Sequence, residues 1–269
     1  MIKRTFLSWI YLSFLYIFLF FPALIVVLFS FNTSRVWSFP LRGITWRWYE
    51  ELLARPDAVA AAMNSLIVAT VTMTVSVALG GAVAFAFHQW RFSAKNGVES
   101  LLLLPLLVPN LIWAIGLLLL VGAIHLPTGP ATVILGHVVL TMPYVFLLVR
   151  SRLQSLDPNL ERAARGLGAT SPLIFRRIIL PHVGPALLAS ALISFATSFS
   201  ELVVAFFLTG AGFNTLPVFI YSLIEIEPSP IVNAIASIIF FVAVTCMLSA
   251  ALIGGREVAF THGGDSHDK

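Results

Sequence analysis

Six long runs of apolar residues, separated by shorter polar segments, dominate the pattern of the chain. A helix needs about 20 mostly apolar residues to cross a bilayer, and a backbone in lipid must satisfy its own hydrogen bonds. Barrel strands are about 10 residues long and alternate in polarity, unlike these runs. We therefore predict an all-α, polytopic membrane protein with a single transmembrane domain over residues 1–269. The six predicted helices lie near residues 9–31, 65–87, 101–124, 131–149, 185–208 and 231–254, and a disordered tail is expected at 256–269.

The composition excludes a water-soluble globule. Hydrophobic residues make up 59% of the chain, charged residues 10%, and the mean hydropathy is +0.96. The first run is too long for the apolar region of a cleavable signal peptide, and no small-x-small cleavage site follows it, so we expect it to remain as the first helix. The single cysteine, Cys246, lies in the last apolar run and gives no information on disulfides.

The loop charges predict the orientation. If the N-terminus is inside, twelve Lys and Arg residues fall on the inner side and four on the outer side. This asymmetry follows the positive-inside rule and predicts that both termini and residues 150–184 are cytoplasmic. The net charge of +4 then needs no nucleic-acid partner. The inner residues are Lys3, Arg4, Arg91, Lys95, Arg150, Arg152, Arg162, Arg165, Arg176, Arg177, Arg256 and Lys269, and the outer ones are Arg35, Arg42, Arg47 and Arg55.

The most charged inner segment, ERAARGLGATSPLIFRRIILP at residues 161–181, has the pattern of a helical hairpin. Asp157-Pro158 is typical of an N-cap followed by proline at the first helical position. Gly166 and Gly168 predict a turn, and Leu180-Pro181 predicts the end of the second short helix.

Each arm of this predicted hairpin has a distinct face. Ala163, Ala164 and Gly168 form a small-residue face that a partner backbone can approach closely. In the second arm Ile174, Ile178 and Ile179 form an apolar face, while the neighbouring arginines stay in water. From composition alone, an amphipathic helix held by anionic lipid explains the segment equally well.

The hairpin pattern resembles the coupling loop, or EAA motif, of ABC importer permeases. The matching residues are Glu161, Ala163 with Ala164, Gly168, and Ile178 through Leu180 and Pro181, placed between the fourth and fifth predicted helices. Downstream, LISFATSFSELVVAFFLTG, LPVFIYSLIE and SPIVNAIASI resemble the second permease of spermidine and putrescine importers. The likeness extends from about residue 65 to residue 250.

The resemblance implies a division of labour between subunits. None of the three lysines lies in a GxxxxGK[ST] motif, so this chain has no phosphate-binding P-loop. We expect no cofactor and no catalytic residue on it. The family implies that ATP and Mg²⁺ bind two partner ATPase subunits, that a second permease completes the pore, and that a periplasmic binding protein delivers the solute at the bacterial inner membrane. On that reading Glu161 and the glycine turn lie in a cleft of the ATPase.

Polar residues inside the apolar runs are candidates for the substrate pathway, because unpaired polar groups are costly in lipid. Glu201 shares a predicted helical face with Ser194 and Ser198, and a carboxylate can balance a cationic solute. Aromatic faces offer cation–π contacts. The other candidates are Asn110, Trp113, His137 and Tyr144. No metal-ligand cluster is apparent.

Each pathway residue also has a structural alternative. Glu201 can lie in a wet vestibule or pair with an arginine of the second permease. His137 and the serines can hydrogen-bond between helices. Pro105, Pro109 and Asn110 can serve only to kink the third helix.

Two departures from the polyamine permeases affect the predicted substrate. Those permeases usually carry paired aspartates where this chain has Ser200-Glu201, and an aspartate where it has Asn110. Fewer anions suit a less cationic solute. An aminoalkylphosphonate, an opine or an amino acid derivative therefore remains an alternative to spermidine or putrescine.

Two further alternatives concern the outer loop and the protein as a whole. The outer segment TWRWYEELL, residues 45–53, is either an interfacial helix that caps the bundle or a contact for an external partner. The protein as a whole could also be a membrane scaffold or an enzyme anchor, although a scaffold has no need of a glycine-hinged hairpin.

Overall fold

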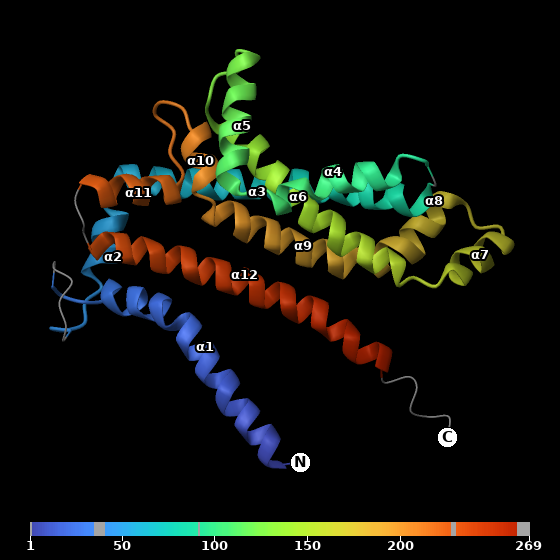
Figure 1. The fold of residues 1–269 in the computed structure, drawn as a ribbon, viewed down its shortest axis with the longest axis horizontal. Helices are drawn as coiled ribbons and strands as arrows, with labels where there is room; N and C mark the ends of the chain where they lie inside the picture. Colours follow the sequence, from blue (N-terminus) through green and yellow to red (C-terminus); the bar gives the residue numbers. More distant parts are fainter. Residues whose placement is uncertain (1, 35–40, 91, 227–229, 263–269) are drawn as a thin grey trace.

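The computed structural model describes residues 2–34, 41–90, 92–226 and 230–262, and every regular element in this part of the chain is helical. Figure 1 shows an elongated bundle with the short helices α7 and α8 at one end and α2 and α11 at the other. The elements are α1 (Ile2–Ser30), α2 (Arg47–Leu53), α3 (Pro56–Gln89), α4 (Lys95–Leu107), α5 (Asn110–Ala123), α6 (Pro130–Gln154), α7 (Pro158–Gly166), α8 (Ser171–Ile174), a π-helical turn η1 (Phe175–Ile179), α9 (Leu180–Ser200), α10 (Val203–Leu208), α11 (Leu216–Ile226) and α12 (Pro230–His262).

Three helices, α3, α6 and α9, pack against one another and form the centre of the bundle. Small residues allow the close contact: an added Cβ at Gly80 would lie 2.8 Å from Val145 Cβ and 2.9 Å from the Met142 carbonyl oxygen. Small-residue contacts of this kind are how membrane helices gain packing energy, since lipid offers no hydrophobic drive for association. Around this centre α12 packs on α9, and α1 packs on α12.

The predicted third helix, 101–124, is instead two helices. α4 and α5 meet at an angle of 111°, and α5 projects sideways from the bundle (Figure 1). Pro109 has no N–H to continue the helical ladder, and it forces Val108 into an extended conformation (φ −95°, ψ 134°). Pro105 lies inside α4 without ending it. Of the two prolines proposed as kinks of the third helix, only Pro109 divides it.

The predicted fifth helix, 185–208, is also interrupted. α9 ends at Ser200, Glu201 is extended (φ −74°, ψ 119°), and α10 begins at Val203. Glu201 therefore lies at a break between two helices and not inside one continuous helix. α9 also begins earlier than expected, because the helical path runs without interruption from Ser171 to Ser200.

The remaining helices are longer than their apolar cores. The spans predicted at 9–31, 65–87, 131–149 and 231–254 correspond to α1, α3, α6 and α12. α12 continues to His262, into the segment 256–269 expected to be a tail. Residues 263–269 lie outside the described part of the chain.

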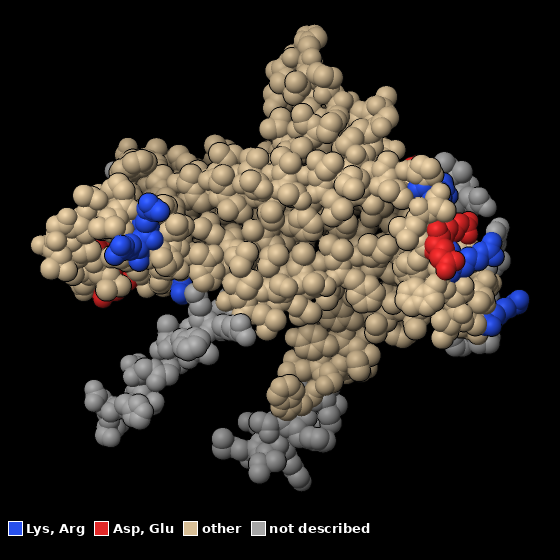
Figure 2. Space-filling model, turned by 180° about the vertical axis from the view of Figure 1, so that it is seen from behind, with Lys and Arg blue, Asp and Glu red and all other residues tan. Residues whose placement is uncertain are grey.

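Five of the described helices are long and apolar enough to cross a membrane, and a sixth is obtained if α4 and α5 together make one span. On the face drawn in Figure 2, Lys, Arg, Asp and Glu side chains gather at the two ends of the bundle, and a broad belt between them carries none. This distribution suits a multi-pass membrane protein. Six spans remain a prediction.

We predict that Gly80→Ala destabilises the protein by about 1–3 kcal/mol, because the new methyl group would overlap backbone and Cβ atoms of α6. A thermal unfolding assay on the purified, detergent-solubilised protein should show a lower midpoint. Gly116→Ala is the matched control, since Gly116 is helical with nothing within 4 Å of an added Cβ. An unchanged midpoint for Gly80→Ala would contradict the close α3–α6 contact.

Candidate functional site

The first arm of the hairpin, α7, begins as its sequence predicts. The Asp157 carboxylate accepts a hydrogen bond from the Asn159 N–H at 2.9 Å, and Pro158 takes the first helical position. The turn after α7 depends on Gly168 alone, at φ +83°, whereas Gly166 is the last residue of the helix and has no such requirement. The expectation of a two-glycine turn is therefore wrong for Gly166.

The second arm does not stop at Leu180-Pro181. α8 passes through the π turn η1 directly into α9, and the Leu180 N–H bonds to the Phe175 carbonyl five residues back. In a regular α-helix the Pro181 ring would collide with the carbonyl four residues earlier. The wider π turn avoids that collision without ending the helix. The hairpin arm and the membrane helix are consequently one continuous element.

The apolar face of the second arm packs as expected. Ile174 and Ile179 are buried, and Ile178 is half-buried in the same cluster, where Ala164 also packs. This cluster holds the hairpin against α3 and α6.

Glu161 faces the interior of this chain. Its side chain is buried, with 9% of the residue exposed. One carboxylate oxygen lies 2.8 Å from His88 Nε2 at the end of α3, and the other accepts a hydrogen bond from Arg165 at 3.1 Å. Glu161 therefore ties α7 to α3, which the sequence did not indicate.

One exposed side of α7 is apolar, next to the exposed Arg162 and Arg165. Leu167, at 89% exposure, and Leu160 project into solvent, together with the exposed Ala163. Their spacing of three and four residues places them on one helical face. Gly166 and Gly168 beside them are open, with nothing within 4 Å of an added Cβ.

Three predicted pathway residues are sealed inside the central helices. His137 Nδ1 lies 2.8 Å from Ser198 Oγ, and Ser194 is fully buried. One helical turn along α6, Thr141 Oγ1 lies 2.7 Å from Ser76 Oγ. This polar stripe connects α3, α6 and α9 and does not open to the surface of the described chain. It agrees with the alternative in which His137 hydrogen-bonds between helices.

A second group of pathway residues lies at the two helix breaks. Asn110, the first residue of α5, donates from Nδ2 to Glu201 Oε2 at 3.3 Å. The other carboxylate oxygen of Glu201 accepts from the Val204 N–H of α10 at 3.0 Å. Asn110 is exposed and Glu201 is half-buried. The structure therefore brings Glu201 and Asn110 together at an accessible corner and separates them from His137.

Trp113 and Tyr144, the two aromatic candidates, differ in exposure. Tyr144 on α6 is exposed, whereas Trp113 on α5 is half-buried and its Nε1 has no hydrogen-bond partner within the described residues. In the same part of the chain no group of three His, Cys, Asp or Glu side chains comes together as a metal site would require.

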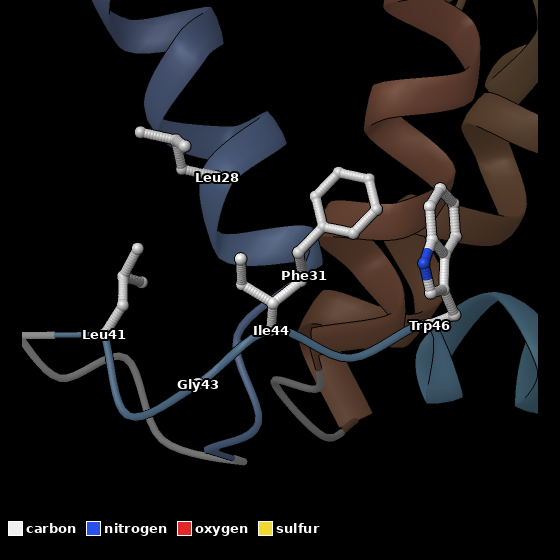
Figure 3. Close-up of a pocket in the computed structure, with 6 residues that line it drawn as sticks. All are labelled: Leu28, Phe31, Leu41, Gly43, Ile44 and Trp46. Atoms are coloured by element: carbon white, nitrogen blue, oxygen red, sulfur yellow. The ribbon is translucent and has the colours of Figure 1, made fainter.

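The outer segment 45–53 caps the bundle through α2. Trp48 is buried and donates from Nε1 to the Asn32 carbonyl at 2.6 Å, and Leu52 is buried beside it. Trp46 instead packs edge-on against Phe31 and lines an open apolar pocket at the end of α1 with Leu28, Leu41 and Ile44 (Figure 3). These contacts favour the interfacial helix over the contact for an external partner.

The family of the chain follows from residues 76–255, which match the model of the binding-protein-dependent transport system inner membrane component. The chain belongs to this family. It is thus a permease subunit of an ABC importer in the cytoplasmic membrane. The assignment argues against the alternatives of a scaffold or an enzyme anchor.

Relatives of this permease are named as polyamine transport proteins. It is 33% identical to the spermidine/putrescine transport system permease protein PotC of Haemophilus influenzae, over 93% of this chain and 97% of the relative. It is 37% identical to the putrescine transport system permease protein PotI of Escherichia coli, over 82% of this chain and 81% of the relative.

Solved structures share the fold of the permease. A chain of the bacterial alginate ABC transporter, in complex with a periplasmic protein that holds an alginate pentasaccharide, superposes with a TM-score of 0.71 at 17% identity. The superposition covers 95% of the permease and 96% of that chain. A chain of an amino acid ABC transporter superposes with a TM-score of 0.60 at 18% identity, over 79% of the permease and all of that chain.

We predict that His88→Ala loosens the hairpin, because Glu161 would lose its contact with α3 and keep only Arg165 on its own helix. Hydrogen–deuterium exchange of residues 158–170 should become faster in the purified permease. His88→Gln, which keeps a donor near the carboxylate, should protect these amides better than His88→Ala. Equal exchange in the wild type and His88→Ala would mean that the hairpin does not depend on this contact.

Proposed function

We propose that this permease imports a small polyamine-like cation, delivered by a periplasmic binding protein, with energy from ATP hydrolysed on two partner ATPase subunits. A second permease would complete the pore, since the Glu201–Asn110 corner of a single chain is open on one side. The observation that carries this proposal is the continuity of one helix from Ser171 in the hairpin to Ser200, next to Glu201.

The hairpin is the proposed docking site for the ATPase. Its outward face offers Leu160, Ala163 and Leu167, an apolar surface that water does not favour and that a cleft in a partner would cover. Gly166 and Gly168 leave room for a partner backbone. Glu161 supports the hairpin from inside the permease in this arrangement, in place of the direct ATPase contact that the motif suggested.

The continuous helix gives a physical route for coupling. Thirty helical residues at 1.5 Å each extend about 45 Å, enough to join the cytoplasmic surface to the outer part of the bilayer. Closure of the ATPase pair would move the hairpin, and the same rigid element would carry that movement to Glu201. Rigid-body movement of a packed helix is an established type of transition between two conformational states.

Glu201 is the proposed counter-charge for the cation. Its carboxylate lies at a break between helices, where backbone and side-chain groups can face a solute path, as in other transporters with discontinuous helices. The names of the relatives PotC and PotI favour spermidine or putrescine.

A monocation or zwitterion is the second candidate for the solute. The corner holds one carboxylate, and Asn110 is a neutral amide bonded to it. A site with fewer anions suits an amino acid derivative, an opine or an aminoalkylphosphonate better than a polycation.

We predict that Gly168→Ala uncouples ATP hydrolysis from transport, because an alanine at φ +83° costs about 1–2 kcal/mol and would distort the turn. Uptake per ATP hydrolysed by the reconstituted importer should fall. Gly122→Ala places the same methyl group in open space at a helical position of α5, away from the hairpin, and should leave that ratio unchanged. Normal coupling in Gly168→Ala would argue against the hairpin as the docking site.

We also predict that Glu201→Gln reduces uptake of putrescine and spermidine about tenfold or more, because a charge-assisted contact is worth about 1.5–3 kcal/mol. Glutamine can still accept from the Val204 N–H, so assembly and basal ATPase activity should persist. Glu51→Gln, on the exposed face of α2, is the control. Unchanged uptake of putrescine and spermidine in Glu201→Gln would mean that Glu201 does not line the path.

A further inference from the structure

A small polar cavity lies on the hairpin side of the bundle, where α3 ends, α4 begins and α6 approaches its end. Its volume is about 150 Å³. Polar side chains from three helices face it, His88, Lys95, Arg150 and Gln154, against an apolar wall of Phe87 and Leu153. A cavity of this size has room for several water molecules or a small polyatomic group.

Two cations of this cavity are held against one aromatic ring. Lys95 Nζ lies 5.4 Å and Arg150 Cζ 5.8 Å from the centroid of the Phe87 ring. Like charges that share a ring repel one another, and the repulsion is stronger near an apolar wall than in water. Glu99 offsets part of this cost at Arg150, and a ligand with negative charge beside Lys95 would offset the rest.

The anions of the described chain compensate this charge only in part. Arg150 is paired with Glu99. Lys95 donates to the Phe87 carbonyl at 2.5 Å and has no carboxylate partner within the described residues. His88 is engaged with Glu161, whose second oxygen is taken by Arg165. One positive charge at Lys95 is therefore left facing the cavity with donors to spare.

The N-terminus of α4 adds a partial positive charge beside the cavity, while the Lys95 N–H itself is bonded to the Phe92 carbonyl. α4 begins at Lys95, and its N-cap, Ala94, has no side chain that caps the helix. The first amides of a helix lack partners inside the helix, and its N-terminus carries a partial positive charge.

The cavity lies at the level expected for lipid headgroups. Trp90 and Phe92, both exposed, stand between the end of α3 and the start of α4. Exposed aromatic residues beside the end of a membrane helix are typical of the interface between bilayer and water. Basic pockets between membrane helices on the cytoplasmic side suit anionic headgroups.

We propose that this cavity binds a phosphate group, namely the phosphodiester of an anionic phospholipid of the inner leaflet, through Lys95 and Arg150. The two cations would supply charge-assisted hydrogen bonds to the phosphate oxygens, and Phe87 and Leu153 would contact the apolar part of the lipid. The site is separate from the Glu201 corner and does not depend on which solute is imported. Free inorganic phosphate has the same chemistry and is the other possible source of the group.

Native mass spectrometry of the assembled importer can test the site. The complex is titrated with phosphatidylglycerol, with phosphatidylcholine, and with phosphatidylglycerol in the presence of millimolar inorganic phosphate. We expect preferential retention of phosphatidylglycerol, reduced about fivefold in Lys95→Gln, since each basic residue near an anionic surface contributes about that factor. Lys95→Arg keeps the charge and should retain the lipid. Retention in this variant would show that Lys95→Gln loses lipid through the loss of charge and not through misfolding.

Arg176→Gln is the matched control, because Arg176 is an exposed cation on the same side of the bundle and away from the cavity. An equal loss of lipid in Arg176→Gln and Lys95→Gln would indicate diffuse attraction and overturn the site, as would equal retention in the wild type and Lys95→Gln. Competition by inorganic phosphate that depends on Lys95 would support the site with free phosphate as its ligand.

Discussion

The structure depends on how the chain accommodates the backbone hydrogen bonds that prolines remove inside the bilayer, where no water can replace them. A helix in lipid has to satisfy its own amides and carbonyls, and each proline removes one donor. Pro109 ends its helix and redirects the chain by 111°, whereas Pro181 is accommodated by a π turn and the helix continues. The first outcome creates the accessible corner at Asn110, and the second joins the hairpin to the helix that ends there. The Asn110 corner and the continuous helix thus both arise at prolines, one of which ends a helix while the other does not.

Hydropathy and local signals were sufficient for the helical class, the approximate spans, the Asp157 cap and a glycine turn after α7, although not for which of the two glycines makes that turn. These depend on the residues of one segment and on the length of its apolar run. The same signals failed at Pro181, because the sequence around a proline does not indicate whether the preceding turn can widen. They also failed at Glu201, where a helix was expected to continue and instead ends.

The pathway residues illustrate a different limit. A polar stripe on one helix reveals that it faces something other than lipid, but not whether that is a solute or a neighbouring helix. His137 and Ser198 face each other across α6 and α9, while Glu201, three residues from Ser198, faces Asn110. The contact between His88 and Glu161 joins positions 73 residues apart, and neither position carries a local signal for the other. Such pairings are decided by the packing of whole helices and only the three-dimensional structure reveals them.

The peripheral position of α1 has a consequence for how permeases of this family can differ. Its main packing partner is α12, most of its described side chains are exposed, and the matched family segment begins at residue 76, inside α3. The central helices α3, α6 and α9 make their contacts without it. An N-terminal helix attached in this way can be lengthened, shortened or replaced during evolution at little cost to the folding of the remainder, so diversity among such proteins can accumulate at this end while the core geometry is retained.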